Sequence, residues 1–172
     1  FGLAEIIKEN YPEKDVHVVG DTSDFVSFLG TPEKATITDE MYKGALAIVV
    51  DCGSADRVSD QRYQTADKVI KIDHHIAQVH YGDIVYVEEE SPACCQIITK
   101  FAKEMGLKIN EKAAFALYTG LVTDTGRFRF RGVDSDTFDA ASELMKHNVD
   151  VEVLDNKLSV ETMNVIKYKG YV

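Results

Sequence analysis

Two stretches of the sequence decide the fold: Ala45-Leu-Ala-Ile-Val-Val-Asp51 and Val69-Ile-Lys-Ile-Asp-His-His75. Each is a short, largely apolar run that ends in acidic or imidazole side chains. Such runs are typical of strands that are buried on both faces, as in a parallel sheet. Residues 83–87 form a third strand candidate, and we also expect a strand over residues 16–19, before the turn former Gly20.

Helical patterns surround and follow these strands. The spacing of apolar residues predicts a first helix over residues 1–10 and short helices within 21–44 and 60–66. Beyond the strands it predicts helices over 92–105, 111–123, 135–147, 150–158 and 161–169, with Ser91 and Asp134 as N-caps. This order predicts an α/β fold in which a mainly parallel β-sheet is flanked by helices and followed by a helical run.

Composition limits the possible functions. The 172 residues suit one domain, and the formal net charge of −10 argues against duplex DNA held by a broad basic face. A phosphorylated substrate stays possible, because a bound divalent metal reverses the local charge; a solvated acidic surface explains the charge equally well. The three cysteines do not suggest a disulfide framework, and no apolar run is long enough to span a membrane. We therefore expect a cytoplasmic protein.

Three chemistry-bearing features stand out: Asp51, the triplet Asp73-His74-His75, and Asp124 within Thr123-Asp-Thr-Gly126. The first two follow predicted strands, and ligands of open α/β sheets bind beyond the carboxyl ends of the strands. Carboxylate and imidazole donors together suit a divalent ion such as Mn²⁺ rather than Ca²⁺. Taken singly, Asp51 also fits a turn residue, and Asp124 with Gly126 fits a helix stop. Two consecutive histidines are harder to explain structurally.

The order Asp51, Asp73-His74-His75 and Gly120-Leu-Val-Thr-Asp124-Thr-Gly126 resembles motifs of the DHH phosphoesterase superfamily. Among its branches, the chain is most similar to nanoRNases (oligoribonucleases) that also dephosphorylate 3′-phosphoadenosine 5′-phosphate (pAp). Stretches that carry this similarity include Gly2-Leu-Ala-Glu-Ile, Tyr11-Pro-Glu-Lys, Tyr81-Gly-Asp83 and Asp124-Thr-Gly-Arg-Phe128.

The resemblance implies a Mn²⁺-dependent phosphohydrolase that acts on short single-stranded RNA, linear dinucleotides or pAp. In that scheme Asp51 bridges two Mn²⁺ ions, and His74 and Asp124 complete the shell of the second ion. His75 contacts the substrate phosphate and Asp73 orients its neighbours, so that these two are the candidate catalytic residues. A metal-activated hydroxide attacks phosphorus in line, and the metals stabilise the developing charge.

The resemblance also implies parts that this sequence lacks. We expect a first metal motif of the type His-x-x-x-Asp-x-Asp before Phe1 and a substrate-binding domain after Val172. Residues 1–172 are then an incomplete DHH domain, which we expect to be inactive by itself. Where relatives tend to carry Ser and Thr at the start of the helix after the third strand, this chain has Cys94-Cys95, which weakens the expectation of substrate contacts there.

Several alternatives stay open. Arg127, Arg129 and Arg131 form either a solvated segment or a phosphate contact, for which Arg127 is the first choice. A cyclic-di-AMP phosphodiesterase is the second enzyme candidate, ahead of an inorganic pyrophosphatase. A non-catalytic regulatory domain is a different class, against which the intact Asp51, His74, His75 and Asp124 argue. The helices after residue 111 favour either a homodimer or a monomer core.

Overall fold

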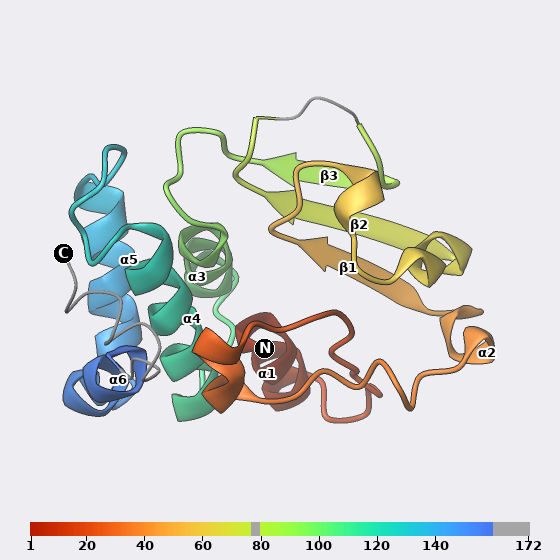
Figure 1. Ribbon diagram of the computed structural model, residues 1–172, viewed down its shortest axis with the longest axis horizontal. Coiled ribbons are helices and arrows are strands. Elements are labelled where there is room, and N and C mark those ends of the chain that lie inside the picture. Colours follow the sequence, from red (N-terminus) through yellow and green to blue (C-terminus); the bar gives the residue numbers. More distant parts are fainter. Residues whose placement is uncertain (77–79, 160–172) are drawn as a thin grey trace, which may run out of the picture.

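The computed structural model describes residues 1–76 and 80–159 (Figure 1). Its strands are β1 (Leu46–Val50), β2 (Lys68–Asp73) and β3 (Ile84–Val87). Its helices are α1 (Gly2–Asn10), α2 (Asp39–Tyr42), α3 (Cys94–Glu104), α4 (Glu111–Asp124), α5 (Ser135–Met145) and α6 (Val151–Leu158). Three 3-10 helices complete the described part: η1 (Asp24–Leu29), η2 (Ala55–Arg57) and η3 (Gln61–Thr65).

The sheet has the order β1-β2-β3, and both pairs of strands are parallel. Val50 is in register with Ile72, and Asp73 with Val87, so that the three strands end at one edge. In Figure 1 the strand arrowheads at this edge point toward α3 and α4. The predicted α/β fold, a parallel sheet with flanking helices followed by a helical run, is thus confirmed.

Two apolar clusters form the core. The larger one joins α1, α3, α4, α5 and α6, and Leu117, Leu121 and Leu144 are almost fully buried within it. The smaller one lies against the sheet and contains Val49 of β1, Val69 of β2 and Tyr63 of η3. The edge at which the three strands end therefore lies between two apolar cores. The strands pack in the smaller core and the helices pack in the larger one.

Local sequence signals fix where the later helices begin. The side chains of Asn110, Asp134 and Asp150 each accept a hydrogen bond from a backbone N–H in the first turn of α4, α5 and α6. Asp134 and Thr137 form a reciprocal capping box, which confirms Asp134 as the N-cap of α5. In the described part of the chain, no helix is long and apolar enough to cross a membrane.

Two local predictions are wrong. Residues 16–19 form no strand; instead the Val18 carbonyl accepts a hydrogen bond from the Glu33 backbone N–H, in a loop connection. Ser91 is not the N-cap of α3, because its N–H closes a turn onto the Glu88 carbonyl and the helix begins after Ala93. The predicted helix over 161–169 lies outside the described residues.

Candidate metal centre

Asp51 directly follows β1 and still pairs with the neighbouring strand β2 through its backbone. Its backbone N–H donates to the Ile72 carbonyl at 3.0 Å, which continues the pairing of β1 and β2 by one residue. Its φ of 58° lies in the left-handed region, which non-glycine residues rarely adopt, although aspartate tolerates it better than most. Such a backbone conformation often marks a functional position. Here it ends the strand and places the carboxylate beside the triplet at the end of β2.

Asp73 is the last residue of β2 and is fully buried. Its Oδ1 atom accepts three hydrogen bonds: from the backbone N–H groups of His74 (2.8 Å) and His75 (3.2 Å), and from the His75 ring Nδ1 (2.8 Å). Burial alone would raise the pKa of Asp73, but these hydrogen bonds and the nearby Lys71 ammonium hold it below its ordinary value. Asp73 is therefore an ionised, buried carboxylate, and its hydrogen bonds orient both histidines.

His74 has its ring held from the opposite side. Its Nδ1 lies 3.0 Å from the Ser91 carbonyl oxygen, and because a carbonyl only accepts, Nδ1 carries the proton. The other ring nitrogen, Nε2, then faces Asp51 Oδ1 at 3.2 Å. The Asp51 carboxylate raises the pKa of His74 above its ordinary value. A ring fixed in this way by a backbone carbonyl is the usual arrangement of a metal-binding histidine.

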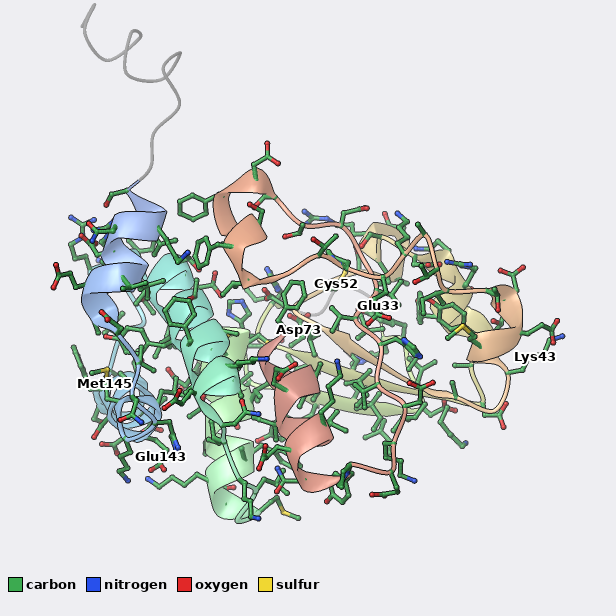
Figure 2. All side chains as sticks on the ribbon, turned by 90° about the horizontal axis from the view of Figure 1, so that it is seen from below. Glu33, Lys43, Cys52, Asp73, Glu143 and Met145 are labelled. Atoms are coloured by element: carbon green, nitrogen blue, oxygen red, sulfur yellow. The ribbon has the colours of Figure 1, made fainter. Side chains whose placement is uncertain are left out.

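Asp51, His74 and His75 together can hold a cation. Each offers one ligand atom, and these atoms lie within 4.8 Å of one another. Figure 2 shows Asp73 and Cys52, the neighbours of these residues, in the middle of the molecule. One carboxylate and two imidazoles form a mixed oxygen and nitrogen donor set, which suits a divalent transition metal such as Mn²⁺. The structure thus brings together three of the site residues predicted from the sequence.

Asp124 approaches this cluster from the helical side. It is the last residue of α4 and does not share the 4.8 Å group of the other three. Although the residue keeps an exposed surface, partial desolvation and then the Asp51 carboxylate raise the pKa of Asp124 to about 6. Two carboxylates that repel each other in this way are stabilised by a cation between them. The role of Asp124 as a further metal ligand stays a prediction, because its carboxylate interacts with Asp51 but lies outside the group of three.

Arg127 is engaged elsewhere. Its Nη1 atom lies 2.5 Å from the Asp155 carboxylate of α6, and its φ is 60°. A phosphate contact by Arg127 would require exchange of this ion pair, so that its substrate role stays a prediction.

Two other positions that the structure connects to the site were not predicted from the sequence: the Ser91 carbonyl and Lys71. Lys71 did leave a signal, because it is a charged residue inside an otherwise apolar strand.

Comparison with known proteins decides the family. The model of the DHH family, N-terminal domain, matches residues 1–121. The chain belongs to the DHH family. The DHH chain is 40% identical over 171 residues to a probable bifunctional oligoribonuclease and PAP phosphatase NrnA of Streptococcus mutans, covering 99% of this chain and 54% of the relative. It is 38% identical over 174 residues to the bifunctional oligoribonuclease and PAP phosphatase NrnA of Bacillus subtilis, covering 99% and 55%.

A solved structure shows the same DHH fold. It is the crystal structure of an exopolyphosphatase-related protein from Bacteroides fragilis, with a TM-score of 0.87 and 21% sequence identity. The superposition covers 99% of this DHH chain and 54% of the other. The chain thus spans about half the length of the relatives that it matches.

Proposed function

We propose that this DHH chain is the metal-binding part of a Mn²⁺-dependent phosphohydrolase that cleaves short oligoribonucleotides and removes a phosphate from pAp. The observation that carries the proposal is the convergence of Asp51, His74 and His75 at the carboxyl ends of two parallel strands. The named activities of the NrnA relatives point to this substrate class. The formal net charge of −10 suits a short substrate rather than a duplex.

The residues would divide the work as follows. Asp51, His74 and Asp124 would hold divalent cations, which, when bound, supply positive charge at the phosphoryl group and acidify the attacking water. His75, whose ring is half exposed, would contact the substrate phosphate through the ring nitrogen that Asp73 does not hold. Asp73 would keep that ring in position. Two ions need more ligands than these side chains offer, so we propose that a segment outside the 172 residues completes the shell.

The test uses the intact protein that contains this chain. Hydrolysis of the dinucleotide pApA, pAp, cyclic-di-AMP and pyrophosphate is measured with Mn²⁺, with Mg²⁺ and with a chelator. We expect turnover of pApA and pAp that depends on Mn²⁺. Asp51→Asn should lower kcat more than about 100-fold, since loss of a ligand exceeds the ~10–100-fold effect of changes around the ligands.

Asp139→Asn is the matched control, because Asp139 is an exposed residue on α5 that should leave turnover unchanged. Dominant hydrolysis of pyrophosphate would refute the proposed substrate class. Dominant hydrolysis of cyclic-di-AMP would support the second candidate enzyme instead. Absence of turnover of all four compounds, with an intact fold, would favour a regulatory DHH domain.

A further inference from the structure

Lys71 is a charged side chain in the interior of the protein. It lies in the middle strand β2, two residues before Asp73, and only 1% of its side chain is exposed. Lysine is almost never fully buried unless its ammonium group is paired, because an uncompensated buried charge is strongly destabilising. The contacts of this ammonium group therefore show what keeps Lys71 in place.

Among the described residues, three groups lie around the Lys71 ammonium. Its Nζ atom lies 3.3 Å from Asp73 Oδ2, 3.4 Å from the Gly53 carbonyl oxygen and 4.7 Å from the centre of the Tyr81 ring. The Tyr81 hydroxyl in turn donates to the Cys52 carbonyl at 2.6 Å. Cys52 and Gly53 directly follow Asp51 in the sequence. Lys71 thus connects the segment after β1 with the carboxylate that ends β2.

The two oxygens of Asp73 have separate partners. Oδ1 accepts the three hydrogen bonds from His74 and His75, whereas Oδ2 is buried and has no hydrogen bond of good geometry in the described structure. The Lys71 ammonium is the charged group that faces Oδ2. A half-turn of the carboxylate only exchanges two equivalent oxygens, whereas a partial rotation would take one oxygen away from the His75 ring and the other away from the Lys71 ammonium. The position of the ammonium therefore determines which way the carboxylate faces.

We propose that Lys71 is a positioning residue of the hydrolytic site: its ammonium group fixes the orientation of the Asp73 carboxylate, and Asp73 in turn fixes the His75 ring. The inference rests on the proposed function, in which His75 contacts the substrate phosphate. The packing of His75 agrees with a fixed ring, since a Cβ at Gly53 would lie 3.2 Å from the His75 Cβ. A side chain at residue 53 would therefore press on the base of the His75 side chain.

Lys71→Met tests the proposal in the intact protein, because methionine retains an apolar stem and removes the charge. In the metal-free protein, the two-bond ¹H–¹⁵N spectrum of the histidine rings reports which nitrogen of His75 carries the proton. We expect the wild-type His75 to show a single tautomer with the proton on Nδ1, and Lys71→Met to show a mixture. We expect kcat to fall about 10–100-fold, the range for groups that orient an active-site ligand, with a much smaller change in KM.

Two controls on the same strand separate positioning from stability. Val69→Ala removes buried apolar contacts and should lower the melting temperature, but should leave the His75 tautomer and kcat unchanged. Lys68→Met removes an exposed lysine that pairs with Asp83 and should change none of the three readouts. If Lys71→Met does not fold, Lys71→Gln, which fills similar space without the charge, carries the same test.

A wild-type His75 spectrum in the folded charge-free variant would overturn the proposal. The proposal would also be overturned if Lys71→Met and Val69→Ala lowered the melting temperature equally and lowered kcat equally. Lys71 would then have only a structural role. The ring spectrum needs neither metal nor substrate. It therefore tests the link from Lys71 to His75 even if the intact protein hydrolyses none of the proposed substrates.

Discussion

The contact of α3 and α4 at Cys95 should depend on the absence of a side chain at Gly120. A Cβ built at Gly120 would clash with the Cys95 sulfur, while the Cys95 Cβ would lie at 3.4 Å, an ordinary contact distance. Gly120 lies one helical turn before Asp124, on the same side of α4. Burial, followed by the charges of Asp124 and Asp51, raises the pKa of Cys95 to about 12, so that this side chain is a neutral thiol.

Two opposing terms set the effect of Gly120→Ala. Alanine in a helix interior is more favourable than glycine by about 0.5–1 kcal/mol, whereas overpacking a full core costs about 1–3 kcal/mol. Because the obstacle is the Cys95 sulfur, we expect Gly120→Ala to destabilise the wild type by about 1 kcal/mol. In a Cys95→Ala background the sulfur is absent and only the gain remains. There Gly120→Ala should stabilise the protein by about 0.5–1 kcal/mol.

Urea unfolding of the four proteins of this double-mutant cycle measures both effects. The reasoning requires a change of sign between the two backgrounds. If Gly120→Ala changes the free energy of unfolding equally with and without the Cys95 sulfur, the close helix contact does not limit this position. Metal-dependent turnover of the same proteins then shows whether the spacing of α3 and α4 also sets the position of Asp124.

Two further predictions concern stability. Hydrogen bonds from Arg62 lower the pKa of the buried Asp60 carboxyl to about 2, so that Asp60 stabilises the fold above pH about 4 and loses this contribution as the pH falls through about 2. The advantage of wild type over Asp60→Asn in urea unfolding should therefore be present at pH 6 and shrink toward pH 2; an advantage independent of pH would contradict it. Asp134→Ala removes the capping box of α5 and should lower the free energy of unfolding by about 1 kcal/mol. Asp139→Ala, on the exposed face of α5, should leave it unchanged. Equal losses of stability in thermal unfolding would exclude a capping effect.

The part of the site that follows the strands could be predicted from the sequence. Apolar runs that end in Asp51 and in Asp73-His74-His75 indicate neighbouring parallel strands, and such strands end at one edge. The left-handed backbone of Asp51 could not be predicted, because position 51 itself is not a glycine, the residue that would signal this conformation. The role of Ser91 was also hidden: its identity as a serine suggested a helix cap, whereas its backbone carbonyl, which every residue possesses, orients His74.

The predicted strand over residues 16–19 was wrong because backbone contacts cannot be read from the side-chain pattern. A pattern of apolar residues records what a segment can bury, but a strand also needs a partner for its backbone, and Val18 bonds to Glu33 in a loop instead. Lys71 shows the converse case. Its charge within an apolar strand contradicts the local pattern, and such a conflict between local pattern and fold is expected where a site needs a buried charge.

The site depends on how two separately packed halves meet. Asp51 and the triplet are fixed to the sheet, whereas Asp124 is fixed to the helical core through Leu121 and its neighbours. The segment before and at the start of α3 joins the halves: the Ser91 carbonyl binds His74, and the Cys94 thiol contacts the Ile72 carbonyl at 3.4 Å. A shift of α3 would therefore move the His74 ring and, through the tight contact of Cys95 with Gly120, the end of α4 that carries Asp124. Packing at the α3–α4 contact should consequently tune the distance between the ligands of the proposed metal ions without any change in the ligands themselves.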